Sequence, residues 1–208
     1  MAVKLQFDDR KSSEAAALML GHPSDRMKDW KLFALLYLAD REALLRLGCP
    51  ITMDRYFLVS KRSRHHDGVS VRMPILANVD YLIGQGASKT IISAHRFPSQ
   101  WSTLISFDEI TREAFLSQLG EIVPQRLSDA EIELLNEIRR DYGQLDDAAL
   151  IEKIQTLPEL GDLYGDYIEI SYRDILLHAG RSSEEIEFIE QELASLETGS
   201  FFEPRLST

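Results

Sequence analysis

The sequence has a single cysteine, Cys49, and lacks any long run of apolar residues. One cysteine cannot form an internal disulfide, and it cannot supply the several thiolates of a cysteine-rich zinc site. No apolar run approaches the roughly 18 residues that a membrane span needs. The first residues, MAVKLQFDDRKSS, also lack the apolar centre of a signal peptide. These absences predict a cytoplasmic protein without a membrane partner.

Basic charge is also scarce, because 23 Lys and Arg residues stand against 34 Asp and Glu residues, for a net charge of −11 at pH 7. Duplex binding draws its affinity from Lys and Arg side chains that neutralise phosphates, so this balance argues against general nucleic-acid binding. One short stretch is an exception and contains Lys61, Arg62, Arg64, His65, His66 and Arg72. That stretch is either a solvated loop or a patch for an acidic partner.

Motifs for catalysis are missing or incomplete. The cluster most similar to a metal site is His65-His66-Asp67, but adjacent residues on a loop point apart, and no HExxH-type helix supplies further ligands. There is no GxSxG nucleophile elbow, and Gly84-Gln85-Gly86 lacks the remaining glycine of a dinucleotide fingerprint. We therefore expect no enzyme, no cofactor and no bound metal. The alternative of another class is a small metal-dependent hydrolase that uses His65, His66 and Asp67.

What the sequence does contain is a strongly apolar segment, because Leu32 to Ala39 are eight apolar residues in a row. A helix built from them is apolar on every face, which predicts a buried central element. Asp40 and Arg41 interrupt this run, and we expect them at the rim of the helix, since an unpaired buried charge costs several kcal/mol or more.

Capping and breaking residues predict a mainly α-helical fold, a compact multi-helix domain around that central helix. Residues 1–198 are expected to form a single domain, and residues 199–208 a frayed tail. The expected helices start at Ser12 or Ser13 and end at Leu20, start at Ser24 or Asp25 and end at Leu47, and cover 52–59 and 71–83. Further helices are expected at 128–142, 146–154, 172–179 and 183–196, with capping boxes at Ser128 and Ser182. Residues 90–94 and 102–107 are expected to form a small two-stranded β ribbon.

Two motifs carry a family resemblance. The first is KLFALLYLADR at residues 31–41, followed by Gly48-Cys49-Pro50-Ile51 and by Asp54-Arg55-Tyr56. The second is LSDAEI at residues 127–132, followed by Tyr142-Gly143. In these motifs the chain resembles the SocA-like antitoxin family, also called the Panacea domain. The resemblance covers roughly residues 14–180.

The sequence departs from the family pattern between the two motifs. Relatives usually carry a Gly-Pro-Val segment followed by a small hydroxyl residue at the start of the next helix. The corresponding segment here is either Met73-Pro74-Ile75-Leu76-Ala77 or His66-Asp67-Gly68-Val69-Ser70, and the loop of residues 60–72 is longer and more basic than usual. If this segment contacts the partner, the choice of partner has diverged.

The resemblance implies an antitoxin that binds a co-encoded toxin protein and suppresses it. Some relatives resemble adaptors that deliver the toxin to an ATP-dependent protease, so a proteolytic adaptor or a phage-associated regulatory binding module is the alternative. A homodimer is compatible with either role. The Asp40-Arg41-Glu42 cluster is either a paired charge cluster or an anchor in which Arg41 holds an acidic group of the partner. The candidate partner-binding residues are Tyr37, Asp40, Arg41, Asp54, Arg55, Tyr56, Lys61, Arg62, Arg64, Arg72 and Pro74.

Overall fold

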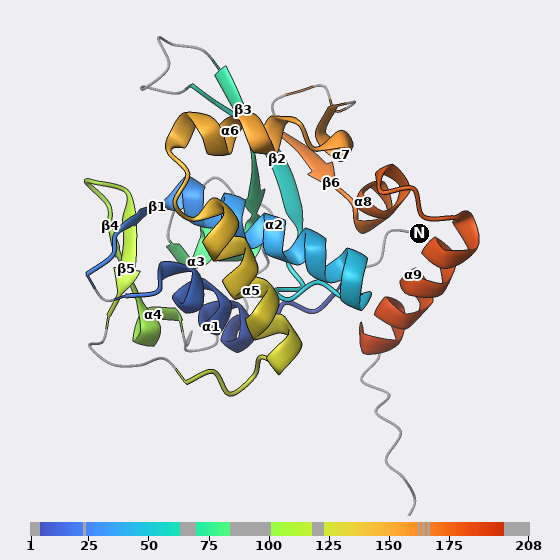
Figure 1. Ribbon diagram of the computed structural model, residues 1–208, viewed down its shortest axis with the longest axis horizontal. Coiled ribbons are helices and arrows are strands. Elements are labelled where there is room, and N and C mark those ends of the chain that lie inside the picture. The colour runs from blue at the N-terminus through green and yellow to red at the C-terminus, as the bar shows by residue number, and fades with distance from the viewer. Residues whose placement is uncertain are drawn as a thin grey trace, which may run out of the picture.

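The computed structural model describes residues 5–22, 24–62, 70–83, 101–117, 123–161, 163, 165 and 167–197, with the backbone alone at 60–62, 70 and 102. Its centre is helix α2 (Asp29–Leu47), which packs against α1 (Asp9–Leu20) and α5 (Asp129–Tyr142) (Figure 1). All eight residues from Leu32 to Ala39 are buried. The predicted mainly α fold around a buried central helix is confirmed.

The fold also contains two small antiparallel sheets of three strands each, where we expected one two-stranded ribbon. The first has the order β1 (Met27–Lys28), β5 (Glu113–Leu116), β4 (Ile105–Asp108). The second has the order β3 (Ser70–Leu76), β2 (Tyr56–Arg62), β6 (Tyr167–Ile170). The expected strand at 102–107 is confirmed for residues 105–107, which belong to β4, whereas residues 102–104 belong to helix α4 (Trp101–Leu104); residues 90–94 lie outside the described residues.

The second sheet corrects two predicted helices. In the expected helix at 52–59, residues 52–55 are neither helix nor strand and residues 56–59 belong to strand β2. The first half of the expected helix at 71–83 is strand β3, and the second half is helix α3 (Ala77–Ile83). Neighbouring residues such as Phe57 and Leu58 are both buried, so both faces of the strand are apolar. A strand of this kind has no polar–apolar alternation, and its apolar run cannot be distinguished from a buried helix by periodicity.

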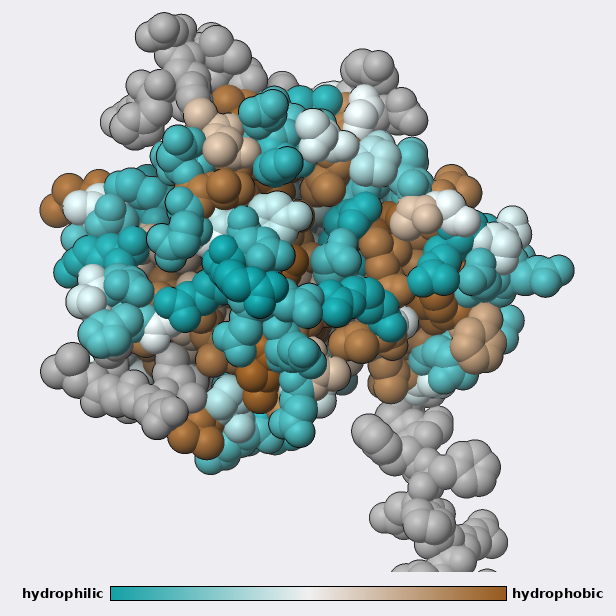
Figure 2. All heavy atoms as spheres, in the orientation of Figure 1, coloured by the Kyte–Doolittle hydropathy of each residue, from teal (hydrophilic) through white to brown (hydrophobic). Residues whose placement is uncertain are grey.

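The C-terminal helices agree with their predicted start signals. Helix α5 begins after the Ser128–Glu131 capping box, and α6 (Asp147–Gln155) begins after Asp146, whose carboxylate accepts from Ala149 N–H. Next come α7 (Pro158–Gly161), α8 (Tyr172–His178) and α9 (Ser183–Glu197), the last opened by the Ser182–Glu185 box. Helix α5 turns Leu134, Leu135 and Ile138 inward, and its outer surface is largely hydrophilic (Figure 2).

Two helix starts differ from the prediction. Helix α1 begins at Asp9 with Asp8 as its cap, and Ser13 lies inside the helix, where its hydroxyl donates to the carbonyl of Asp9. Helix α2 begins at Asp29 because Met27 and Lys28 pair with β5. Among the described helices, none is long and apolar enough to cross a membrane.

Candidate functional site

Asp40 lies on the central helix and is completely buried, which corrects the expectation that it sits at a solvent-facing rim. Its carboxylate accepts hydrogen bonds from Thr52 N–H (2.9 Å), from the Thr52 hydroxyl and from the Tyr56 hydroxyl (3.0 Å). Burial raises the pKa of Asp40 to about 6, and these three hydrogen bonds counteract part of that rise. Asp40 therefore attaches the turn after α2 to the helix.

Arg41 is paired inside the protein. Its Nε donates to Glu159 Oε1 at 2.7 Å, and its Nη1 donates to Glu42 Oε1 at 2.9 Å. Glu159, on α7, is buried and also accepts from the Tyr37 hydroxyl at 3.0 Å. These contacts join the middle of α2 to α7, and the Arg41 side chain is mostly buried.

Asp54 caps helix α3 from outside the helix. It is completely buried, and its oxygens accept from Asn78 N–H (3.0 Å), Val79 N–H (3.0 Å) and Arg55 N–H (2.7 Å). Negative charge at the first turn of a helix is favourable because the free N–H groups point toward it. Burial raises the pKa of Asp54 to about 7 against the effect of these donors.

An aromatic series connects these groups. The rings of Tyr37 and Tyr56 meet edge to face at 5.2 Å between centroids, and Tyr56 meets Tyr172 in the same manner at 5.5 Å. The Tyr172 hydroxyl donates to the carbonyl of Asp54 at 2.6 Å. One buried polar and aromatic network therefore joins α2, the turn after it, β2, α7 and α8.

Five candidate partner-binding residues are consequently inside the fold. They share a buried side chain, and they are Tyr37, Asp40, Asp54, Tyr56 and Pro74. A side chain without exposed area offers no contact to a protein docked on the outside. The expectation that they form a surface is corrected, and their role in this structure is to hold the domain together.

Arg55 differs because its side chain is exposed. It pairs with Glu169 on β6 at 2.9 Å, and its guanidinium lies 5.1 Å from the ring centroid of Phe57. Phe57 in turn stacks on Tyr167 of β6, with centroids 4.6 Å apart. Tyr56 and Leu58 face the core, so alternation along β2 places Phe57 on the opposite face, where it is 5% exposed beneath Arg55 and Tyr167. Arg55 directly precedes the strand. We call Arg55, Phe57, Tyr167 and Glu169 the Arg55 patch.

The Arg55 patch has the composition of a protein interface. Tyr and Arg are enriched among the residues that contribute most to protein–protein binding, and stacked aromatic rings give a rigid contact surface. Tyr167 is exposed and belongs to the patch although nothing in its local sequence marks it.

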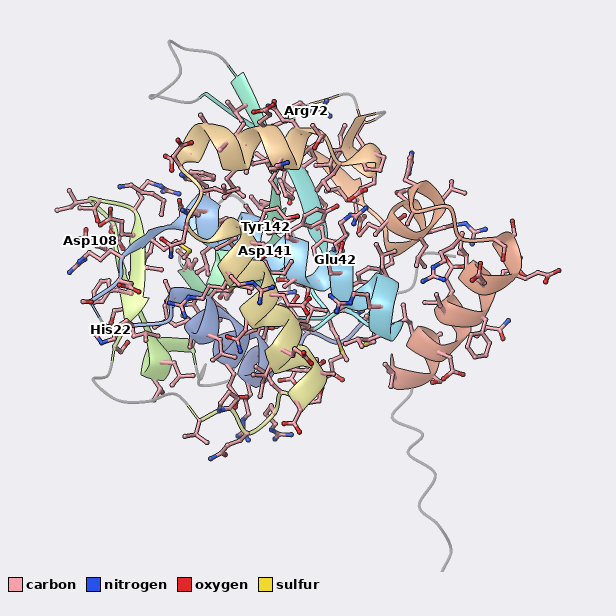
Figure 3. All side chains as sticks on the ribbon, in the orientation of Figure 1. His22, Glu42, Arg72, Asp108, Asp141 and Tyr142 are labelled. Atoms are coloured by element: carbon pink, nitrogen blue, oxygen red, sulfur yellow. The ribbon has the colours of Figure 1, made fainter. Side chains whose placement is uncertain are left out.

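The basic stretch is only partly described. Lys61 and Arg62 belong to β2 with undescribed side chains, and Arg64, His65, His66 and Asp67 lie outside the described residues. Arg72 on β3 donates through Nη2 to the carbonyl of Leu163. Figure 3 places Arg72 near one end of β3, apart from Glu42, the neighbour of Arg41 on α2. Arg72 and the Asp40-Arg41 pair therefore do not form one surface.

The described part brings together no set of side chains suited to holding a metal ion. In that part no three His, Cys, Asp or Glu side chains are arranged to hold a metal ion, and the proposed His65-His66-Asp67 cluster falls outside it. Burial raises the pKa of the Cys49 thiol to about 11, which keeps it protonated near neutral pH.

Reasoning from the sequence did not select Glu159 or Tyr172. Both contact residues more than 100 positions earlier in the chain. Glu159 follows a helix-breaking proline and Tyr172 follows a helix cap, so local patterns identify the helix starts and not these partners.

Comparison with known proteins adds one positive finding. The family model described as antitoxin SocA-like, Panacea domain, matches residues 32–159. The match contains Asp40, Arg41, Asp54 and Glu159, and it ends before β6, α8 and α9. No curated protein and no solved structure matches the chain.

Proposed function

The chain belongs to the SocA-like antitoxin family, and on that premise we propose that it neutralises a co-encoded toxin by direct protein–protein binding. The observation that carries this proposal is the family match, which covers most of the central helix and its network apart from Tyr172 of α8. Such a role requires an exposed contact surface of suitable chemistry rather than a catalytic centre.

We assign this surface to the Arg55 patch, in which Arg55 belongs to the motif at 54–56 and Phe57, Tyr167 and Glu169 lie outside both motifs. Tyr167 is exposed and Arg55 is partly exposed, and the Arg55 guanidinium is held between Glu169 and the Phe57 ring. A side chain that is already ordered loses less conformational entropy on binding than a freely rotating one. The patch is therefore preorganised to receive a partner.

Arg41 is a poor test of partner binding in this structure, because its main contact is the buried carboxylate of Glu159. Replacing it would disturb the core and weaken any complex indirectly. Arg55→Ala and Tyr167→Ala remove exposed side chains and are the informative changes.

The experiment is co-expression with the product of the adjacent gene, followed by co-purification and a growth assay for toxicity. A complex should form, and Arg55→Ala should weaken it roughly tenfold or more. The matched control is Arg140→Ala, because Arg140 is also exposed and also paired with a carboxylate, that of Asp141 at 3.0 Å. The control should change the affinity by less than about twofold.

A harmless neighbour that forms no complex would refute the proposal. Toxin half-life in the same cells separates direct neutralisation from the adaptor role, since an adaptor shortens that half-life and a direct inhibitor leaves it unchanged.

A further inference from the structure

A groove lies between the C-terminal end of α2 and helix α9. Its volume is about 460 Å³. Leu44, Leu45 and Gly48 line it on the α2 side, and Glu184, Phe188 and Ile189 line it on the α9 side. In Figure 2, apolar side chains are visible between the end of α2 and α9. The groove is separate from the Arg55 patch, with which it shares no residue.

Phe188, which lines the groove, is 64% exposed although it is a large aromatic residue. Leu47 and Leu196 do not line the groove, but they are about half exposed on the same two helices. On α9, Glu185, Phe188, Ile189, Glu192 and Leu196 follow helical spacing and lie along one face. Scattered exposed apolar residues are ordinary, but several of them on the two helices that form one groove mark a contact surface.

Helix α9, one wall of the groove, is acidic: it contains Glu184, Glu185, Glu187, Glu190, Glu192 and Glu197 and no Lys or Arg, with Glu190 paired to Arg173 of α8 at 2.7 Å. The two arginines that line the groove already have protein acceptors. Arg46 pairs with Glu137 at 2.6 Å, and Arg181 donates to the Leu45 carbonyl at 2.7 Å and to Glu185 at 3.2 Å. Within the lining, Glu184 and Glu185 balance the two arginines. The excess of carboxylates comes from Glu137 beside Arg46 and from Glu192, which lies one turn beyond Phe188 on the same face of α9.

We propose that this groove binds a basic amphipathic helix of a partner protein, with an apolar side chain of that helix packed against Phe188 and its Lys or Arg side chains beside the α9 glutamates. An apolar stripe flanked by positive charge matches both the apolar lining and the acidic rim. This proposal rests on the proposed function in one respect: the partner whose basic helix binds the groove is taken to be the toxin.

Only one wall of the groove belongs to the part of the chain that matches the family. The α2 wall lies within the family-matched residues 32–159, whereas the α9 wall lies outside them. The C-terminal helix of this chain therefore adds a second contact surface to the family domain. A basic helix bound there would be selected by residues that the family match does not include.

The direct test uses the full chain and a fluorescent synthetic peptide with Leu at helical spacing and Lys elsewhere. Its counterpart has Glu in place of Lys. Anisotropy should show binding of the Lys peptide, weakening with added salt, and no binding of the Glu peptide. Phe188→Ala should weaken binding roughly tenfold or more, whereas Ile110→Ala, which removes a 94% exposed side chain from the β4–β5 turn, should change it less than about twofold.

A second pair of variants tests the charge. Glu184→Lys combined with Glu192→Lys should weaken binding of the Lys peptide and reduce its salt dependence. Glu152→Lys combined with Glu109→Lys makes the same change of charge at exposed positions on α6 and in the β4–β5 turn, which do not line the groove, and should have a much smaller effect. Circular dichroism checks that each variant remains folded.

Several results would overturn the assignment. Equal binding of both peptides, no binding of either, or an unchanged affinity for Phe188→Ala would each reject it. Self-association that disappears in Phe188→Ala would assign the groove to a second copy of the chain. A chain ending at Glu197 that binds the Lys peptide roughly tenfold more tightly would assign the groove to residues 198–208.

The same variants, tested with the product of the adjacent gene, separate the groove from the proposed function. A complex that forms normally with Phe188→Ala rejects the groove as the toxin site and leaves the antitoxin role standing. A groove that binds the Lys peptide as expected while no complex forms with the neighbour rejects the antitoxin role and supports the chemistry assigned to the groove.

Discussion

Asp40, Asp54 and Glu159 are buried carboxyl groups, and the structure satisfies each of them in a different way. Glu159 has a cation partner in Arg41. Asp54 accepts mainly from backbone N–H groups at the start of α3, whereas two of the three donors to Asp40 are hydroxyl groups. Hydroxyl groups can also accept hydrogen bonds, so Asp40 can remain satisfied when it carries a proton.

This difference predicts a pH effect at Asp40. The pKa of Asp40 is about 6 in the folded protein against 3.8 for an ordinary aspartate carboxyl, so the folded state holds the proton more tightly. The contribution of Asp40 to stability is therefore full below about pH 4 and is lost as the pH rises through about 6. Asp40→Asn should remove this dependence and gain on the order of 3 kcal/mol relative to wild type between pH 4 and pH 8.

Urea unfolding at a series of pH values measures this effect. Asp141→Asn, the same change of charge at an exposed position, is the control and should follow the wild-type profile. If the difference in stability between Asp40→Asn and wild type does not depend on pH, the buried carboxyl does not titrate as stated.

Two arginines of the same helix should differ in their effect on stability. Arg41→Ala leaves the buried Glu159 carboxylate without its cation and should cost about 3–5 kcal/mol. Arg46→Ala removes an exposed ion pair with Glu137 and should have little measurable effect. Thermal or urea unfolding compares the two variants, and similar losses would contradict the buried character of the Arg41 pair.

At the residue scale, the sequence identifies residues that matter to the structure but predicts that they lie at the surface, whereas most of them are buried. Asp40, Arg41 and Asp54 were selected because charge interrupts an apolar segment and because they belong to the motif. Whether they face solvent depends on what packs against α2, and the partner of Arg41 is Glu159, 118 positions later. No local pattern contains that information.

At the scale of elements, helix ends were predicted better than strands. The Ser128, Asp146 and Ser171 caps act within their own first turns, where each side chain accepts an N–H three residues on. The sequence predicts helix where β2 and β3 lie because neighbouring side chains at 56–58 and 73–76 are all buried, so both faces of these stretches are apolar. The β2–β3 pairing, from Tyr56 with Leu76 to Arg62 with Ser70, joins residues that no short-range signal connects.

Gly48 at the end of α2 and Gly161 at the end of α7 should respond differently to replacement by alanine. Gly48 has a φ of 79° in the left-handed region, and an added Cβ at this position would meet nothing within 4 Å. Gly48→Ala should therefore cost about 1 kcal/mol through backbone strain alone. Gly161 has equally open space without a positive φ, so Gly161→Ala should be neutral or stabilising by up to about 1 kcal/mol. Equal losses for both variants in urea unfolding would argue against a conformational cause.

At the scale of the whole molecule, elements that follow the family-matched residues pack against elements within them. Strand β6 pairs with β2, and Tyr172 of α8 packs against Tyr56 and donates to the carbonyl of Asp54. These elements therefore belong to the same packed body as the central helix. Helix α9 contacts mainly α8, and it leaves the groove against α2.

This arrangement predicts a single cooperative unfolding transition. Trp30 at the start of α2 and Trp101 in α4 report on tertiary packing, while far-ultraviolet circular dichroism reports on helix content. Because the sheets connect the N- and C-terminal elements, both signals should change at the same urea concentration. Two separated midpoints would show that part of the chain unfolds independently.

The sequence by itself determined the helical class, the buried character of residues 32–39 and the starts of the C-terminal helices. Apolar runs and capping side chains act over a few residues, and their effect does not depend on the rest of the fold. Only the tertiary structure decided that Asp40 and Asp54 are internal, that β2 and β3 are strands, and that α9 forms a groove with α2. Those outcomes depend on surfaces that meet from distant parts of the chain, where burial and long-range pairing outweigh local preference.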